Sequence, residues 1–149
     1  MVKMKLTIEE NKSFLEPNVI IKCAFVNEEV NKIVNAVNAC QKKFAGVYEG
    51  KKFYIPLEDI YFFESLEDKT FMYTASAVYE CEHRLYEIEK LIYGFSFCRV
   101  SKQAIVNIKK IEHIKPQLNG RFEASLDNGL RQIVNRHYVA DLRRMFESL

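Results

Sequence analysis

Two short segments in the C-terminal half gather side chains that suit nucleic-acid binding. The first reads FCRVSKQAIVNIKK from Phe97 to Lys110, with Arg, Ser, Lys, Gln and Asn set among apolar residues. The second is Asn135-Arg136-His137-Tyr138, which joins an expected strand to an expected helix. Arg, Lys, Gln and Asn are the side chains that bind phosphate oxygens and base edges. The start of a helix adds free backbone N–H groups that favour phosphate. These segments are the first candidates for a binding site.

Residues for catalysis show no recognisable spacing. The three histidines are His83, His113 and His137, and none lies in a spacing typical of metalloenzymes. The chain also lacks the glycine-rich phosphate loops and the nucleophile elbow of common enzyme families. We therefore predict no catalytic residue, no metal site and no cofactor, and we do not expect an enzyme.

The four cysteines are Cys23, Cys40, Cys81 and Cys98. Neighbouring cysteines lie 17 or more residues apart in the chain, whereas structural zinc sites take their ligands in close pairs. Each cysteine has apolar neighbours in the sequence. We therefore expect four reduced, buried thiols.

Length and composition indicate an ordinary globular chain. Of its 149 residues, 48% are hydrophobic and 28% are charged, which allows one domain with a core and a small appendage. No apolar run approaches the roughly 20 residues of a membrane helix, and Met1–Glu10 has no signal-peptide core. We expect a cytoplasmic protein that does not insert into a membrane.

Positive charge concentrates toward the C-terminus. Residues 1–97 carry 12 Lys and Arg against 15 Asp and Glu, whereas residues 98–149 carry 10 against 5. A basic C-terminal third on a mildly acidic body indicates an anionic partner at one end of the molecule.

The first 45 residues have the pattern of a small strand–helix extension. Val19–Val26 alternates apolar residues and predicts a strand. Asn27 is a suitable helix N-cap, and an apolar stripe at helical spacing runs from Val30 to Phe44. Gly46 is the expected end of this helix.

From residue 46 onward, the pattern predicts a mainly β (α+β) domain with a sandwich or barrel-like body. Short apolar runs are separated by turn residues, as strands of such a body require. The expected strands are Lys52–Ile55, Ile60–Glu64, Thr70–Ala75, Ala77–Glu82, Phe97–Val100, Ala104–Asn107, Ile111–Lys115, Arg121–Leu126 and Leu130–Val134. A short helix is expected around Leu85–Ile92, and a last one from about Tyr138 with Asn135 as its cap.

Several segments, taken in order, resemble the LytTR family of DNA-binding domains. They are IPLEDIYFFES from Ile55, FCRVSKQAIVNIKKI from Phe97, NGRF from Asn119, the strand pair around Asp127-Asn128-Gly129, and VNRHYVADL from Val134. The likeness covers residues 46–149 and leaves residues 1–45 as the extension. Many members of this family of response regulators carry a receiver domain, and 45 residues are too few for one. The chain therefore resembles the stand-alone members.

The resemblance implies a multi-stranded β-sandwich with short helices that binds double-stranded DNA. Family members bind through loops that enter successive major grooves, mostly as two protomers on paired direct repeats. Carried over to this chain, the contact regions are three. They comprise Lys69 and Thr70, then Ser101, Lys102 and Gln103, and finally Arg136 and His137. His137 would make binding sensitive to pH, because a histidine changes charge near neutral pH.

Some residues near these regions leave alternatives open. Arg99 is either structural or a phosphate contact. Asn107 is expected to bond backbone in a turn, and Tyr61-Phe62-Phe63 is expected in the core rather than as a stacking platform. The stripe from Val30 to Phe44 packs either on its own domain or on a second copy in a homodimer.

The main hypothesis is thus a sequence-specific transcriptional regulator. The alternative is a β-rich protein-interaction or ligand-sensing domain that has lost DNA binding. The two differ in where Lys69, Lys102 and Arg136 lie, because DNA binding needs them on one edge. In either case, a regulatory partner of unidentified kind would supply the input signal.

Overall fold

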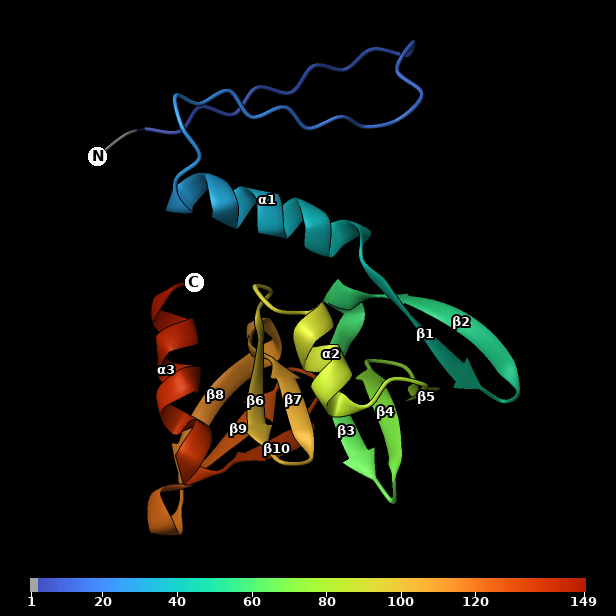
Figure 1. The fold of residues 1–149 in the computed structure, drawn as a ribbon, viewed down its shortest axis with the longest axis vertical. Coiled ribbons are helices and arrows are strands. Elements are labelled where there is room, and N and C mark those ends of the chain that lie inside the picture. The colour runs from blue at the N-terminus through green and yellow to red at the C-terminus, as the bar shows by residue number, and fades with distance from the viewer. Residues whose placement is uncertain (1–2) are drawn as a thin grey trace.

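A computed structural model describes residues 3–149, which form two antiparallel sheets with three α-helices (Figure 1). The larger sheet has the strand order β2-β1-β5-β4-β3-β7-β6, and the smaller one has the order β10-β9-β8. The helices are α1 (Glu28–Gln41), α2 (Leu85–Leu91) and α3 (Val139–Glu147). The strands are β1 (Lys43–Tyr48), β2 (Lys51–Pro56), β3 (Ile60–Leu66), β4 (Lys69–Thr74), β5 (Val78–Cys81), β6 (Phe97–Ser101), β7 (Ala104–Asn107), β8 (Ile111–Pro116), β9 (Phe122–Leu126) and β10 (Arg131–Val134). Four 3-10 turns are η1 (Leu57–Asp59), η2 (Ile108–Lys110), η3 (Leu118–Gly120) and η4 (Arg136–Tyr138).

Strand β3 lies between two hydrophobic cores. Successive side chains of a strand point to opposite faces, so Phe63 enters a core with α2 residues Leu85 and Ile88. Phe62 enters a second core that β9 and β10 close from the other side, together with Leu142 of α3. Burial on both faces fixes the strand register. The expected core role of the aromatic strand is confirmed.

The mainly β fold with short helices, expected from the sequence, is confirmed. The expected strands between residues 52 and 134 all form, each within about two residues of its expected bounds. Gly94 lies in the turn after α2 with φ +88°, and Gly129 lies in the turn of the last hairpin with φ +86°. These left-handed conformations suit glycine, which has no Cβ. The expected boundary between residues 45 and 46 falls inside β1.

Helix α1 begins where the sequence indicates but ends earlier. The Asn27 side chain accepts from the Val30 N–H at 3.0 Å, so the N-cap is confirmed. The expected end at Gly46 is wrong, because Lys42 is already extended and β1 follows. Phe44 is buried at the start of this strand instead of on the helix. Gly46 lies in β1, where a Cβ would come within 2.6 Å of the Tyr79 Cβ.

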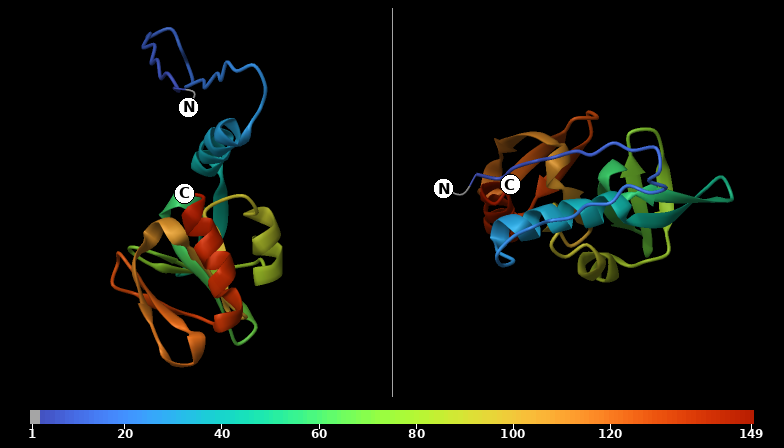
Figure 2. Two further views of the ribbon diagram at one scale, coloured as in Figure 1. Left: turned by 90° about the vertical axis from the view of Figure 1, so that its left-hand side faces the viewer. Right: turned by 90° about the horizontal axis from the view of Figure 1, so that it is seen from above.

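The strand expected at Val19–Val26 is wrong. Residues 3–26, here called the N-terminal arm, contain neither helix nor strand. The arm extends beyond α1 and away from both sheets (Figure 2). A strand needs a neighbour for its backbone N–H and C=O groups, and no strand lies beside this segment. The alternating pattern is therefore present without the pairing that makes a strand.

Two further expectations are corrected. Cys81 and Cys98 are buried, but Cys23 and Cys40 are exposed, and all four thiols are free. Cys23 lies in the arm and Cys40 near the end of α1, where no core covers them. Asn135 makes no side-chain capping bond at the start of η4. Among residues 3–149, no helix has the length and apolar content to cross a membrane.

Candidate nucleic-acid interface

The first expected contact region lies at the turn between β3 and β4. Glu67 and Asp68 form the turn with φ values of 49° and 64°, a left-handed conformation that costs energy for residues with a Cβ. Lys69 is exposed, but its Nζ lies 3.8 Å from the Glu80 carboxylate. Thr70 is only 5% exposed and has no surface to offer a ligand. This turn therefore presents two acidic side chains and one paired lysine.

The second region is the tip of the hairpin between β6 and β7. Ser101 pairs with Ala104, so Lys102 and Gln103 form the tight turn and are both exposed. The Ser101 hydroxyl oxygen accepts from the Gln103 N–H at 3.2 Å. Within residues 3–149, Lys102 takes part in none of the ion pairs, so its ammonium group is available to an anion.

The third region precedes α3. Arg136 and His137 lie in η4 and are exposed, whereas Tyr138 packs against the second core. Arg136 also forms no ion pair in the part of the chain that the structure describes. Its guanidinium can therefore donate two parallel hydrogen bonds to a phosphate or to a guanine edge.

Backbone hydrogen bonds bring these regions together. The Ser65 N–H donates to the Gln103 carbonyl oxygen at 2.8 Å, which joins the first hairpin to the second. The Asn135 N–H donates to the Val100 carbonyl oxygen at 2.8 Å, which joins η4 to β6. The two hairpin tips and the start of α3 thus lie along one edge, at the bottom of the view in Figure 1. Lys69, Lys102 and Arg136 belong to this edge, here called the loop edge.

The two sheets are also bonded to each other close to the loop edge. The Gln132 side-chain amide on β10 donates to the Glu64 carboxylate on β3 at 2.8 Å. The same carboxylate acts with burial, which is the larger cause, to raise the pKa of Tyr73 above its ordinary value. Glu64 is half-buried, so its charge is held at a defined place between the sheets.

Arg121 was missed in the sequence. The turn η3 brings Gly120 beside Arg136, since a Cβ on Gly120 would lie 3.5 Å from the Arg136 Cβ. Arg121 follows this turn and is exposed. The Asn119-Gly120 pair predicts a tight turn, but it does not predict that this turn lies beside Arg136. The contact between Gly120 and Arg136 joins residues that are distant in sequence.

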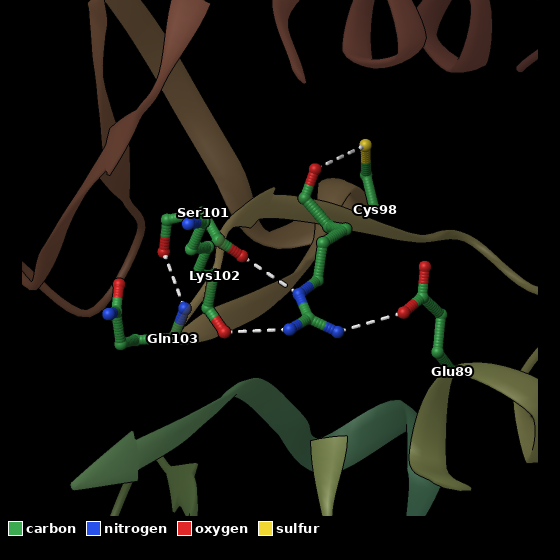
Figure 3. A network of polar contacts seen from close by, with 6 residues as sticks. Glu89, Cys98, Ser101, Lys102 and Gln103 are labelled. Carbon is green, nitrogen blue, oxygen red and sulfur yellow. Dashed lines mark hydrogen bonds and ion pairs between the residues drawn. The ribbon is translucent and has the colours of Figure 1, made fainter. Parts of the chain in front are cut away.

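Arg99 lies on β6 of the second hairpin, and all of its side-chain bonds are to protein groups. Figure 3 shows the network around its partners Glu89, Ser101 and Lys102. Its Nε donates to the Ser101 carbonyl oxygen at 2.8 Å, and its Nη2 donates to the Lys102 carbonyl oxygen at 2.6 Å. Its Nη1 pairs with the Glu89 carboxylate of α2 at 2.8 Å. Of the alternatives left open for Arg99, these bonds favour the structural one.

Asn107 is structural as well. Its side chain is buried, donates to the Ile60 carbonyl oxygen at 3.0 Å and accepts from the Lys109 N–H at 3.1 Å. The expectation of backbone bonding is confirmed. Among residues 3–149, no group of three or more His, Cys, Asp or Glu side chains could hold a metal ion.

Comparison with known proteins identifies the family of this chain. Residues 50–147 match the LytTr DNA-binding domain family. Uncharacterized HTH-type transcriptional regulators of Staphylococcus aureus strains MRSA252 and NCTC 8325 are each 28% identical over 151 residues, covering 100% of this chain and 96% of theirs. A solved LytTr DNA-binding domain, from a Bacillus cereus protein described as a methyl-accepting/DNA response regulator, superposes with a TM-score of 0.66 at 25% identity. It covers 70% of this chain and 95% of the solved one. The chain belongs to the LytTr DNA-binding domain family.

Proposed function

We propose that this protein is a transcriptional regulator that binds double-stranded DNA sequence-specifically through the loop edge. The observation that carries the proposal is the placement of Lys102 and Arg136, both exposed and free of ion pairs, on one edge. The family to which the chain belongs is a family of DNA-binding domains, and relatives across its full length are named as transcriptional regulators. The protein-interaction or ligand-sensing alternative has no support in these comparisons.

The proposed DNA contacts comprise two main residues and several that assist them. Lys102 and Arg136 enter the major groove, where lysine and arginine recognise the guanine edge. Ser101, Gln103 and His137 assist from the same two segments. Thr70 is left out because it is buried.

Lys69 and Arg121 flank these contacts. Lys69 contributes less than its charge suggests, because Glu80 already pairs with it and Glu67 and Asp68 lie in the adjoining turn. Arg121 extends the basic surface toward η3. A regulator that binds chromosomal DNA must be in the same compartment as the chromosome, so we infer a cytoplasmic location. No catalytic step or cofactor is needed.

We infer that two copies bind paired direct repeats, each through its own loop edge. We infer that α1 and the N-terminal arm hold the copies together. Residues Glu28, Asn31, Lys32, Asn35, Ala36 and Ala39 of α1 line a groove of about 850 Å³ over the body. At 3.6 residues per turn these positions share one face. The apolar stripe of Val30, Ile33, Val34 and Val37 is therefore on the opposite face of α1, where Val34 is exposed and Val30 is buried.

The arm supplies further apolar surface for the second copy. Its exposed large apolar residues are Met4, Leu6, Ile8, Phe14, Leu15, Val19, Ile20, Phe25 and Val26. Side chains of this kind bury roughly 60–120 Å² each, so together they offer on the order of 500–1,000 Å². A standard interface buries about 800 Å² on each partner. We infer that these side chains pack against the second copy rather than remain in solvent.

Fluorescence anisotropy with fluorescent duplexes tests the DNA-binding proposal. The duplex from the promoter of the protein's own gene should bind more tightly than a scrambled duplex, and affinity should fall steeply with salt as phosphate counterions are released. Equal, weak binding to both duplexes would contradict the proposal.

Analytical ultracentrifugation tests the dimer. Val34→Asp places a charge on the stripe, and Asn31→Asp places the same charge on the opposite face as a matched control. The wild type and Asn31→Asp should dimerise, whereas Val34→Asp should weaken association by about tenfold or more, because burying an unpaired charge is costly. A wild type that stays monomeric on DNA, or variants that behave alike, would contradict this role of α1.

A further inference from the structure

The tip of the second hairpin is held by bonds that the strand ladder does not supply. The β6–β7 register shifts between Arg99 and Ser101, so the ladder is interrupted just before the turn. The Val100 carbonyl oxygen accepts from Asn135 instead. The two carbonyl groups that follow, those of Ser101 and Lys102, both accept from the Arg99 guanidinium. The Arg99 side chain thus holds the backbone of Lys102, which is the residue proposed to enter the major groove.

The Arg99 guanidinium is in turn oriented by α2. Its Nη1 pairs with Glu89, a carboxylate on the α2 surface whose side chain is 52% exposed. The Arg99 side chain is only 20% exposed, and a guanidinium with three nitrogens directed at fixed acceptors is rigid. The chain of bonds therefore runs from the Glu89 carboxylate through Arg99 to the backbone at Lys102, as Figure 3 shows.

We propose that Arg99, oriented by Glu89, is a positioning residue that sets where Lys102 meets the DNA. This inference rests on the proposed function, since it concerns the same loop edge. A direct phosphate contact by Arg99 is the competing role. If Arg99 contacted phosphate directly, the ion pair with Glu89 would weaken DNA binding. The Glu89 carboxylate would hold the guanidinium away from the DNA and would add a negative charge.

The two roles predict opposite effects for Glu89→Ala. A nearby negative charge repels DNA, so its removal should tighten binding if Arg99 contacts phosphate directly. If Glu89 positions Arg99, its removal should instead weaken binding to the promoter duplex by about three- to tenfold. Glu87→Ala is the matched control, because it removes the same charge from the same helix and does not touch Arg99. It should leave binding unchanged or slightly tighter.

Arg99→Lys separates geometry from charge. Lysine keeps the positive charge but lacks the planar fork that reaches two carbonyl groups and a carboxylate together. The positioning role predicts that Arg99→Lys weakens binding about as much as Arg99→Ala. It also predicts that Arg99→Lys lowers DNA affinity little in the Lys102→Ala background, since both changes remove the same DNA contact.

Hydrogen exchange of the free protein gives a readout independent of DNA. The amide of Gln103, which donates to the Ser101 hydroxyl at the tip, should exchange faster in Glu89→Ala, while amides of β3 and the melting temperature stay close to wild type. Unchanged exchange at the tip, tighter binding by Glu89→Ala, or wild-type binding by Arg99→Lys would each overturn the positioning role alone. A wild-type protein that binds no duplex selectively would overturn the proposed function, and the positioning role with it.

Discussion

The Ser65 N–H donates to the Gln103 carbonyl oxygen at 2.8 Å, and this bond joins the β3–β4 and β6–β7 hairpins near their tips. In the proposed complex, the two turns therefore approach a DNA duplex together. The first turn carries Glu67 and Asp68, and the second carries Lys102. Charges of opposite sign thus lie along one edge, and the acidic turn lowers the attraction that the edge exerts on phosphate.

Removing one of these acidic charges should raise DNA affinity. We expect Asp68→Asn to tighten binding by about two- to threefold at low salt, and the gain should disappear at high salt as the charges are screened. Asparagine tolerates the left-handed backbone at this position, so the turn should keep its shape. The control is Asp59→Asn at the opposite end of β3, which should change affinity little. Weaker binding by Asp68→Asn would indicate that the carboxylate itself contacts the DNA or its water.

The four thiols should differ in reactivity. With a thiol reagent and dilute native protein, Cys23 and Cys40 should react fast, and Cys81 and Cys98 should react only as the protein unfolds, because only the first two are exposed. Cys40→Ala should remove one fast equivalent. At high protein concentration Cys40 should become protected, since α1 is the proposed contact between copies. Four fast thiols would contradict the described burial.

Alkaline pH should destabilise the fold through Cys98. Burial, helped by Asp141 and Glu89, raises the pKa of this thiol from 9.0 to about 11. Between these values the unfolded state loses the proton while the folded state keeps it, so the free energy of unfolding falls as pH rises. The loss reaches on the order of 2–3 kcal/mol near the folded pKa. Urea titrations at several pH values should show a smaller loss for Cys98→Ala than for the wild type and Cys40→Ala. Equal losses in all three proteins would exclude Cys98 as the cause.

The sequence predicts the body of this fold well because its signals there are local. Alternating apolar residues mark each strand, and turn residues such as Asp127-Asn128-Gly129 separate them. The pattern fails at Val19–Val26. Alternating apolar residues indicate which side chains could face a core, but they do not indicate whether a neighbouring strand is present to pair with the segment. The pattern also fails at Phe44, whose spacing continues the α1 stripe although the chain has already become extended.

The loop edge depends on information that a local pattern does not contain. Lys102 and Arg136 were predicted as contacts from a family resemblance, and their placement on one edge follows from the bonds Ser65–Gln103 and Val100–Asn135. These bonds join residues at least 35 positions apart. The burial of Thr70 and the three bonds of Arg99 likewise depend on strand pairing and on α2.

The most direct test of the account is the affinity of three single variants for the promoter duplex. Lys102→Ala and Arg136→Ala should each weaken binding by roughly tenfold or more, in keeping with about 1–3 kcal/mol for a base contact. Both side chains are exposed, so the melting temperature should stay the same. Lys52→Ala, an exposed lysine on the distant hairpin β1–β2, removes the same charge and should bind like the wild type. Wild-type affinity in Lys102→Ala and Arg136→Ala, or an equal loss in Lys52→Ala, would contradict recognition of DNA through the loop edge.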